Sequence, residues 1–573
     1  MPYSGRESTS MSSDSFVSPA SRNQTDVFAV HGADPEVLAY AMARYSRSAL
    51  SMRDSLTEIS AQRAEQFLNT FYFQYGHRSI ADLAHIAFAV ERLSLLAAIV
   101  LVDEQRWDGQ ERSTRYQNFL KSGWYLPDFA TDSSSSALYS ETIANLFTTY
   151  QRVTAAVLEA LRRRVPCPEP LKPDVYERTL KARAFDVARY LLPLAANTSL
   201  GQIVNARTLE TQVSRLLSHP MAEIRDLGLK LREAATGPAW NVNAKAAGAL
   251  VDRIASMEKL ASSKGTGFSP YVSQNGSDGA LAPEGDRKSL AEEAATLLTR
   301  EVRTAPTLVK YAEVNPYLVQ TRAELGRAAA ELLNPLPIAP APLVDLVERT
   351  ESLEVELAAT LLYSASHHPY RQIRDLVAGL PAFRISEIVE LGLKHRGRHD
   401  EAVRAFHAGA ALRFDILMDI GGFRDMHRHR RVTQIVQPFT ALHGYETPTH
   451  AVLPPFDESG PVNLLAEAGI LADFQSAIGA AHAASARIAA GAALEAPLSA
   501  LYLLPLATRV RCLFKMDFAE AQYISELRSA PAGHFSYRRV AWEMFLALQR
   551  HHPSLARHIR VTDFTLPIDL LQR

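Results

Sequence analysis

The sequence predicts an α+β fold that is rich in helix and consists of two copies of one unit. Three observations support this class: long segments with helical periodicity, short runs of alternating or β-branched residues, and a repeated motif. The candidate strands are His85 to Glu91 and Phe414 to Ile420. The segments with helical periodicity cover residues 34–70, 136–165, 206–233, 243–261, 289–302, 321–334, 343–366 and 463–494.

The repeated motif indicates a duplication. Residues 188–195 read ARYLLPLA and residues 500–507 read ALYLLPLA, so the two agree at every position but one. A weaker match of nearly the same offset precedes it, between residues 36–46 and 354–364. One duplication explains both matches better than a common apolar helix fragment does.

Shifts in composition divide the chain into four parts. Residues 1–25 are rich in serine and poor in large apolar groups, which predicts a disordered tail. A stretch rich in Gly, Ser and Pro begins at Ser262 and predicts a flexible linker, followed by a helical insertion. We therefore expect the first repeat over 26–261, the linker and insertion over 262–341, and the second repeat over 342–573.

Composition and charge exclude several classes of protein. The chain has 573 residues, of which 47% are hydrophobic and 21% charged, as in ordinary soluble globular proteins. Its 61 basic and 62 acidic residues leave a formal charge of -1, so we expect neither a nucleic-acid partner nor a membrane partner. The best apolar run, Leu95 to Val102, is too short to span a bilayer. Cys167 and Cys512 are the two cysteines, and their scarcity suits a reducing compartment, the cytoplasm.

The densest cationic cluster is HRHRRVT, from His427 to Thr433. Arginine binds phosphate through two parallel hydrogen bonds, and histidine adds a switchable donor, so the cluster could hold an anionic ligand. The simpler interpretation is a solvated basic turn. A zinc site built from His427, His429 and His443 is weaker still, because the neighbouring arginines repel a cation, and we expect no metal. The glycines of the chain form neither a P-loop nor a dinucleotide-binding fingerprint, so a Rossmann domain is not supported.

A second polar cluster reads ERSTRY, from Glu111 to Tyr116. In an extended chain Glu111, Ser113 and Arg115 project to one face. An acceptor, a hydroxyl and a guanidinium on one face suit a phosphosugar or a uracil-like ring, whereas the simpler interpretation is an exposed polar loop. Upstream, His77 could contact a ligand or be a half-buried structural histidine.

The order of these motifs resembles the flavin-dependent thymidylate synthase family. That family's pattern runs GHxS, a strand, RHRxxSxNExSxRY, an Arg before Leu-Pro, Asn-x-Arg and a late Arg before Ser-His. The first repeat contains GHRSIADLAHIAFAV, ERSTRY, ARYLLPLAANT, VNARTL and SRLLSHPMAEIR in that order. The second is similar through RHRRVT at 428–433, LYLLPLA and ELRS at 526–529. The resemblance covers most of residues 27–260 and 344–545. It implies two tandem domains, each a mostly antiparallel sheet with many helices.

Each repeat departs from the family pattern in a complementary place. Where the first should read RHR, it has Asp103, Glu104 and Gln105. The second keeps RHR but lacks ExSxRY, and Leu501 stands where the first repeat has Arg189. Because the family's sites are assembled from neighbouring subunits, we expect one composite site in which the two surviving halves meet.

The resemblance implies a role for each site residue. Arg215 is expected to polarise the pyrimidine, with Ser113 as the second catalytic residue, and the sequence leaves open whether Arg528 marks a second site. The residues expected to bind deoxyuridine monophosphate (dUMP) are Glu111, Ser113, Arg115, Arg189, Arg215 and Arg428. Those expected to bind FAD are His77, Ser79, Asn205, Arg207, Arg428, His429, Arg430 and Thr433.

The implied reaction is reductive methylation of dUMP to dTMP, with methylenetetrahydrofolate as carbon donor, FAD as hydride source and NADPH to reduce the flavin. A guanidinium against the ring stabilises the charge that develops, so no protein nucleophile is required. The family is tetrameric, so we expect a homodimer that forms a pseudo-tetramer. Two other interpretations stay open: a non-catalytic flavin- or nucleotide-binding homologue, and a helical scaffold that retains only the fold.

Overall fold

The structure is a computed structural model. His77, the tail at 1–25 and most of the linker lie outside the residues it describes. The described residues are 32–44, 56, 78–129, 132–241, 248–249, 252–253, 296, 301–309, 312–348, 352–397, 400, 402–407, 412–448, 455–457, 460–491, 495–557 and 559–571.

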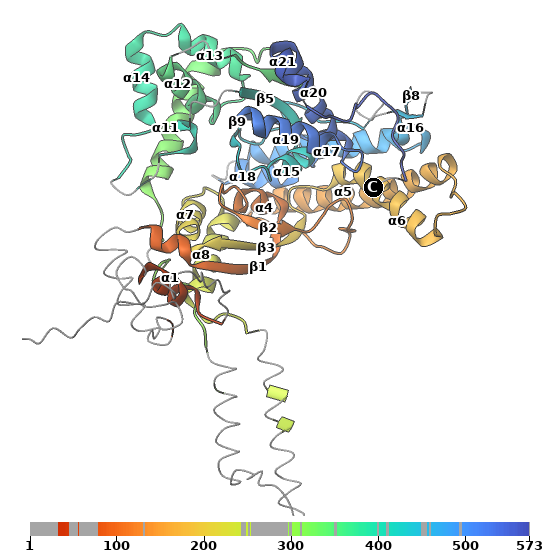
Figure 1. The fold of residues 1–573 in the computed structure, drawn as a ribbon. Helices are drawn as coiled ribbons and strands as arrows, with labels where there is room; N and C mark the ends of the chain where they lie inside the picture. The colour runs from red at the N-terminus through yellow and green to blue at the C-terminus, as the bar shows by residue number, and fades with distance from the viewer. Residues whose placement is uncertain are drawn as a thin grey trace, which may run out of the picture.

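The first repeat is a small antiparallel sheet flanked by helices (Figure 1). The sheet has the strand order β1-β3-β2, so the last strand in sequence lies between the other two. Its elements are α1 (Pro35–Arg44), the 3-10 helix η3 (Arg78–Leu83), β1 (His85–Ser94), α4 (Leu95–Leu101), β2 (Asp108–Glu111), α5 (Ser133–Arg164), α6 (Pro173–Ala188), η4 (Arg189–Leu191), β3 (Asn197–Asn205), α7 (Ala206–Leu217) and α8 (Ala222–Thr236).

The second repeat has the same plan with an additional edge strand, in the order β4-β5-β9-β6. A further helix, α11 (Pro316–Leu333), precedes it. Its elements are β4 (Val344–Leu346), α12 (Leu353–Tyr363), α13 (Tyr370–Ala378), α14 (Ala382–Leu391), η5 (Arg404–Phe406), β5 (Leu412–Asp419), α15 (Ile420–Met426), β6 (Thr433–Val436), β7 (Pro455–Asp457), β8 (Gly460–Pro461), α16 (Leu464–Glu467), α17 (Leu471–Ala489), α18 (Ala496–Ala500), η6 (Leu501–Leu503), β9 (Arg509–Met516), α19 (Phe518–Ser529), α20 (Phe535–His551) and α21 (Pro553–Ala556).

Local capping follows the duplication. Ser94 ends β1 and caps α4, and Asp419 ends β5 and caps α15; each side chain accepts a hydrogen bond from the first turn of its helix. Asn205, the last residue of β3, caps α7 in the same way, and Asp517, directly after β9, caps α19. The shared order of strand, cap and helix confirms the predicted α+β class with two antiparallel sheets.

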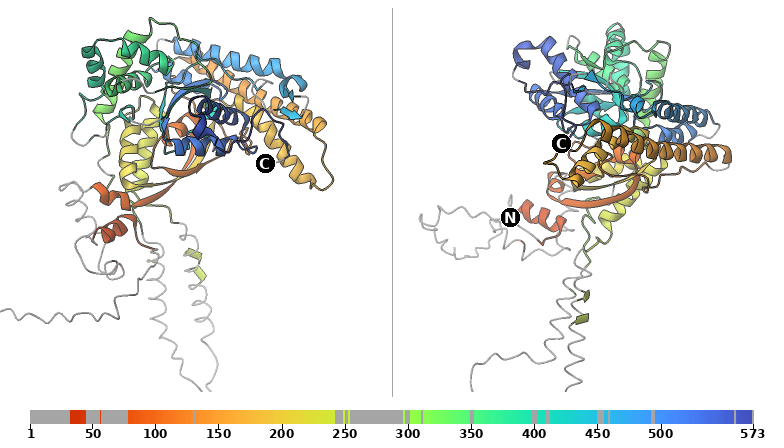
Figure 2. Two further views of the ribbon diagram at one scale, coloured as in Figure 1. Left: turned by 45° about the horizontal axis from the view of Figure 1, so that its top comes forward. Right: turned by 90° about the vertical axis from the view of Figure 1, so that its right-hand side faces the viewer.

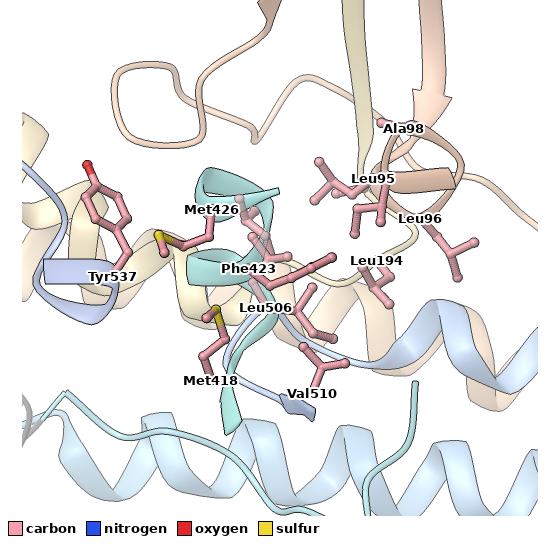
Figure 3. Packing of buried hydrophobic residues seen from close by; sticks show 14 of the residues in the cluster. Leu95, Leu96, Ala98, Leu194, Met418, Phe423, Met426, Leu506, Val510 and Tyr537 are labelled. Atoms are coloured by element: carbon pink, nitrogen blue, oxygen red, sulfur yellow. The ribbon is translucent and has the colours of Figure 1, made fainter. Parts of the chain in front are cut away.

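The two copies of the LLPLA motif pair with each other at the centre of the molecule. Leu194 N–H donates to the Leu504 carbonyl at 2.9 Å, and Leu506 N–H returns a bond to the Leu192 carbonyl at 2.9 Å. Apolar side chains of both repeats meet around this pairing (Figure 3), among them Leu95 of α4 and Phe423 of α15. One hydrophobic core therefore runs through both repeats.

Helices surround the paired repeats and form further contacts away from the central core. Helix α5 of the first repeat packs beside α17 of the second (Figure 2). A second, smaller core lies among α11, α12, α13 and α14, where Tyr363 and Tyr370 are buried. These helices form the green group at the top of Figure 1.

Three predicted helices are interrupted, and one of them, 463–494, divides into α16 and α17 around Gly469. The segment 206–233 divides into α7 and α8 at Ser218-His219-Pro220, because proline cannot continue a helix. The segment 343–366 begins as the strand β4 and turns helical only at Leu353, after the cap residue Ser352. Within the described part of the chain, no helix is long and apolar enough to cross a membrane.

Candidate active site at the interface of the repeats

Arginines from both repeats converge on one carboxylate, Asp425 of α15. Arg189 Nη1 lies 3.1 Å from Asp425 Oδ2. Burial raises the pKa of Asp425, but the charges of Arg189, Arg115 and Arg428, together with His534, outweigh this effect and hold its pKa below the usual value. The charges of three arginines expected to bind dUMP therefore act on a single anionic position, which Arg189 contacts directly.

Arg189 is positioned by η4, directly before the LLPLA pairing, and its side chain is only 1% exposed. Its Nη1 donates to Thr114 Oγ1 at 3.4 Å and to Asp425. Its Nε and Nη2 have no hydrogen-bond partner among the described residues. A buried guanidinium with free donors is costly, so this side chain could donate hydrogen bonds to further anionic oxygens.

Arg115 is held by groups from both repeats. Its Nε and Nη2 donate to the two oxygens of Asp186, at 2.7 and 3.1 Å. From the second repeat, the Tyr537 hydroxyl lies 3.0 Å from Nη1 and the Ala532 carbonyl 3.1 Å from Nη2. Burial lowers the pKa of Arg115, but Asp186 offsets this and raises it above its ordinary value.

Tyr537 connects Arg115 to the RHR segment. The guanidinium of Arg528 lies 5.4 Å from the centroid of the Tyr537 ring, and its Nε donates to His429 Nε2 at 2.8 Å. Burial, and then the charge of Arg528, lower the pKa of His429 to about 3. His429 is therefore neutral at pH 7. With Nε2 as acceptor, its Nδ1 carries the proton and faces Glu520 Oε1 at 3.4 Å.

The RHR segment of the second repeat lies along β2 of the first. Arg428 Nη1 donates to Gln110 at 3.3 Å, and Arg430 donates to Asp108 at 2.8 Å while its guanidinium lies over the Trp107 ring. Nearby, a buried ion pair joins Arg424 to Glu111.

The prediction that Glu111, Ser113 and Arg115 share one extended face is wrong. The chain turns after Ser113, whose hydroxyl accepts a hydrogen bond from Arg115 N at 3.2 Å. Glu111 consequently binds Arg424, whereas Arg115 binds Asp186. The space beside Arg424 and Arg428 is only about 10 Å³, so the described conformation is closed there.

Arg215 lies elsewhere. Together with Arg207 and Glu104 it lines a separate cleft of about 580 Å³ between α7, the start of α11 and residues 400–407. Its Nε donates to Glu104 Oε1 at 2.9 Å and its Nη1 to the Val100 carbonyl at 2.9 Å. Arg207 pairs with Asp82 at 3.3 Å. Arg215 therefore does not join the arginines around Asp425.

The contacts of Arg215 and Arg528 correspond between the repeats. Glu104 is the middle residue of the DEQ segment at 103–105, and His429 is the middle residue of the RHR segment at 428–430. Glu104 binds Arg215 near the end of α7, and His429 binds Arg528 near the end of α19. Arg528, which the sequence left open, is thus the second repeat's counterpart of Arg215, and it lies on the side of the molecule where Arg115 does.

The remaining expected residues have local roles in the described structure. The Asn205 side chain caps α7 by accepting from Thr208 N at 2.8 Å, and Thr433 begins β6 and pairs with Lys515 of β9. Ser79 belongs to η3. Among the described residues there is no group of three or more His, Cys, Asp or Glu side chains that could hold a metal ion.

Sequence reasoning missed the acidic partners of the arginines. Asp425 lies three residues before Arg428, and Asp186 lies three residues before Arg189. Spacing alone relates each acid to the wrong arginine, because Asp425 binds Arg189 and Asp186 binds Arg115. Tertiary packing within the first repeat decides the pair of Asp186 and Arg115, and the docking of the two repeats decides the pair of Asp425 and Arg189.

Fold and site together define a tandem α+β protein with a cationic cluster shared by its two halves. Comparison of the sequence with known families matches the thymidylate synthase complementing protein family twice, over residues 29–237 and 345–554, and the chain belongs to this family. The predicted tandem duplication of a flavin-dependent thymidylate synthase fold is thereby confirmed.

Three similar proteins illustrate the range of the family. A protein of Chlamydia muridarum described as a UPF0159 protein is 25% identical over 572 residues, covering 93% of this chain and 91% of its own. A flavin-dependent thymidylate synthase of Clostridium tetani is 23% identical over 177 residues, covering 31% of this chain and 67% of its own. The crystal structure of thymidylate synthase X from Helicobacter pylori with FAD and dUMP is 18% identical, covers 35% of this chain and 88% of its own, and has a TM-score of 0.24.

Proposed function

We propose that this protein is a FAD-dependent thymidylate synthase that methylates dUMP to dTMP, using methylenetetrahydrofolate and NADPH, at a composite site shared by its two repeats. The observation that carries the proposal is the convergence of Arg115 and Arg189 of the first repeat and Arg428 of the second on Asp425. Neither repeat alone supplies this set of charges.

The cluster suits the phosphate of a nucleotide. Asp425 presents one negative charge to Arg189, whereas a phosphate monoester presents up to two and has three acceptor oxygens. The free Nε and Nη2 donors of Arg189 match those additional acceptors. Nucleotide binding would accordingly displace the Asp425 carboxylate from Arg189, and we expect α15 to shift when this happens.

The remaining roles follow the family pattern. Glu111 and Ser113 would bind the nucleotide, and a guanidinium beside the ring would stabilise the charge that develops on the pyrimidine. Arg528 is better placed than Arg215 for this role, because Tyr537 contacts both Arg528 and Arg115 and so connects Arg528 to the arginine cluster. FAD, when bound, would supply the hydride.

The residues assigned to FAD divide between two places. Asn205 and Arg207 lie at α7, where Arg207 lines the cleft, whereas Arg428, His429 and Arg430 lie between β2 and α19. Ser79 and Thr433 belong to the same proposed set, as does His77. We propose that a homodimer brings the cleft of one chain to the RHR segment of the other and so forms the pseudo-tetramer.

A second candidate function is a non-catalytic nucleotide- or flavin-binding homologue. It is favoured by the two internal acids, because Asp186 and Asp425 already neutralise Arg115 and Arg189. In that case the acids would permanently occupy the position of the phosphate, and any flavin would bind without turnover.

One experiment distinguishes the two. The purified protein is loaded with FAD and reduced, and flavin oxidation is followed by absorbance after addition of methylenetetrahydrofolate with and without dUMP. Oxidation coupled to dTMP formation supports the synthase. Flavin binding with no dUMP-dependent dTMP refutes the synthase and leaves the binding homologue.

A further inference from the structure

A small cavity lies beside the arginine cluster, between α6, α20 and the C-terminal segment 559–571. Its volume is about 30 Å³, and its walls are largely apolar, including Leu161, Phe535 and Ile568. Two buried arginines, Arg183 of α6 and Arg538 of α20, also line it.

Arg538 has hydrogen-bond donors that the protein leaves free. The residue is 1% exposed, and its Nε donates to the Ser529 carbonyl at 3.0 Å. Its Nη1 and Nη2 have no hydrogen-bond partner among the described residues. Burial lowers the pKa of Arg538 to about 10, so the guanidinium is still charged at pH 7. A buried cation with two unpaired donors is strongly unfavourable unless an anion or water completes it.

Arg183 and Asp186 also line the cavity, and both have partners of their own. Arg183 Nε donates to the carbonyl of Leu570, a neutral group, at 3.2 Å. Both carboxylate oxygens of Asp186 accept hydrogen bonds from Arg115. Asp186 therefore does not complete the free Nη1 and Nη2 donors of Arg538.

We propose that this cavity is a binding site for a small monovalent anion of the size of chloride, held by Nη1 and Nη2 of Arg538. The volume suits this class of ligand, because about 30 Å³ accommodates one particle of water or halide size but no phosphate or nucleotide. The site borders the nucleotide cluster through Asp186 but does not depend on the proposed catalytic function.

The position of the site gives the anion a structural role. Arg183 holds the backbone of Leu570, and the guanidinium of Arg538 lies 5.6 Å from the centroid of the Phe564 ring, so both arginines secure the C-terminal segment against α6 and α20. An anion bound to Arg538 would stabilise this attachment. We therefore expect halide to stabilise the folded protein.

Two measurements test the site. Crystals of the full chain are soaked in bromide, and the anomalous difference map is inspected at the guanidinium of Arg538. Thermal unfolding midpoints are compared in chloride and in gluconate at equal ionic strength, for wild type, Arg538→Met and the control Arg550→Met, whose side chain is exposed on the same helix.

We expect a bromide peak within hydrogen-bonding distance of Arg538, and a midpoint about 1 to 2 °C higher in chloride for wild type and Arg550→Met but not for Arg538→Met. A cavity that contains water alone in the bromide-soaked crystals would overturn the proposal. An equal response to chloride in all three proteins would do the same. The crystallographic test uses wild type, so the proposal is still tested if Arg538→Met does not fold.

Discussion

Arg189 and Asp425 form an ion pair across the boundary between the two repeats, with 3.1 Å between Nη1 and Oδ2. The two residues are 236 positions apart in sequence. In the proposed function this pair occupies the position of the nucleotide phosphate, so the Asp425 carboxylate would compete with the ligand for Arg189.

Asp425→Asn removes this competing charge and is expected to increase the affinity for dUMP about tenfold, which corresponds to about 1.4 kcal/mol. Isothermal titration calorimetry measures the affinity. Asp473→Asn is the control, because Asp473 pairs with Arg152 on the surface. Unchanged or weaker binding in Asp425→Asn would contradict the proposed position of the phosphate.

Arg428→Ala tests whether the second repeat contributes to the site. Loss of a charge-assisted phosphate contact should weaken dUMP binding about tenfold to a hundredfold. Arg178→Ala serves as control, since Arg178 is an exposed residue of α6 that pairs with Asp174. If Arg428→Ala binds dUMP as tightly as Arg178→Ala does, the two repeats do not share one site.

The stability of the protein should fall in mild acid because buried histidines resist protonation. Burial, followed by the charge of Arg528, lowers the pKa of His429 from 6.5 to about 3 in the folded protein. Below pH 6.5 the unfolded chain therefore binds a proton that the folded chain does not, and the free energy of unfolding decreases by about 1.4 kcal/mol for each pH unit per such histidine. The contribution is complete above pH 6.5 and is lost toward pH 3.

Urea unfolding at a series of pH values measures this dependence. His429→Gln, which cannot take up a proton, should reduce the slope between pH 6.5 and 4 by about one proton. His552→Gln is the control, because His552 directly follows α20 and is exposed. Identical slopes for wild type and His429→Gln would contradict the neutral, buried state of His429.

Phe423→Ala tests the shared core. Phe423 is 0% exposed between the repeats, and its truncation should reduce the free energy of unfolding by about 3 to 5 kcal/mol. Because one core runs through both repeats, we expect circular dichroism and tryptophan fluorescence to report the same shifted transition in urea. Phe383→Ala, at a position of α14 that is 63% exposed, should change little. Two separate transitions would show that the repeats unfold independently.

Local pattern and repetition were sufficient to predict much of the fold. Helix α5 and the strands β1 and β5 follow from the periodicity of their side chains, and the duplication follows from the two copies of LLPLA. These features depend on residues close in sequence. The break between α7 and α8 also had a local signal, the proline at position 220. The prediction from periodicity alone ignored this signal and gave one continuous helix.

The sequence by itself determined that this chain is a duplicated member of its family, and which basic residues survive in each copy. Only the tertiary structure decided which of them meet: the charges of Arg115, Arg189 and Arg428 act on Asp425, while Arg215 turns to Glu104 in another cleft. The physical reason is that a charge is neutralised by whatever group packing brings within a few ångströms of it. The packing depends on how the apolar surfaces of the two repeats dock, and the spacing of residues along the chain does not predict it.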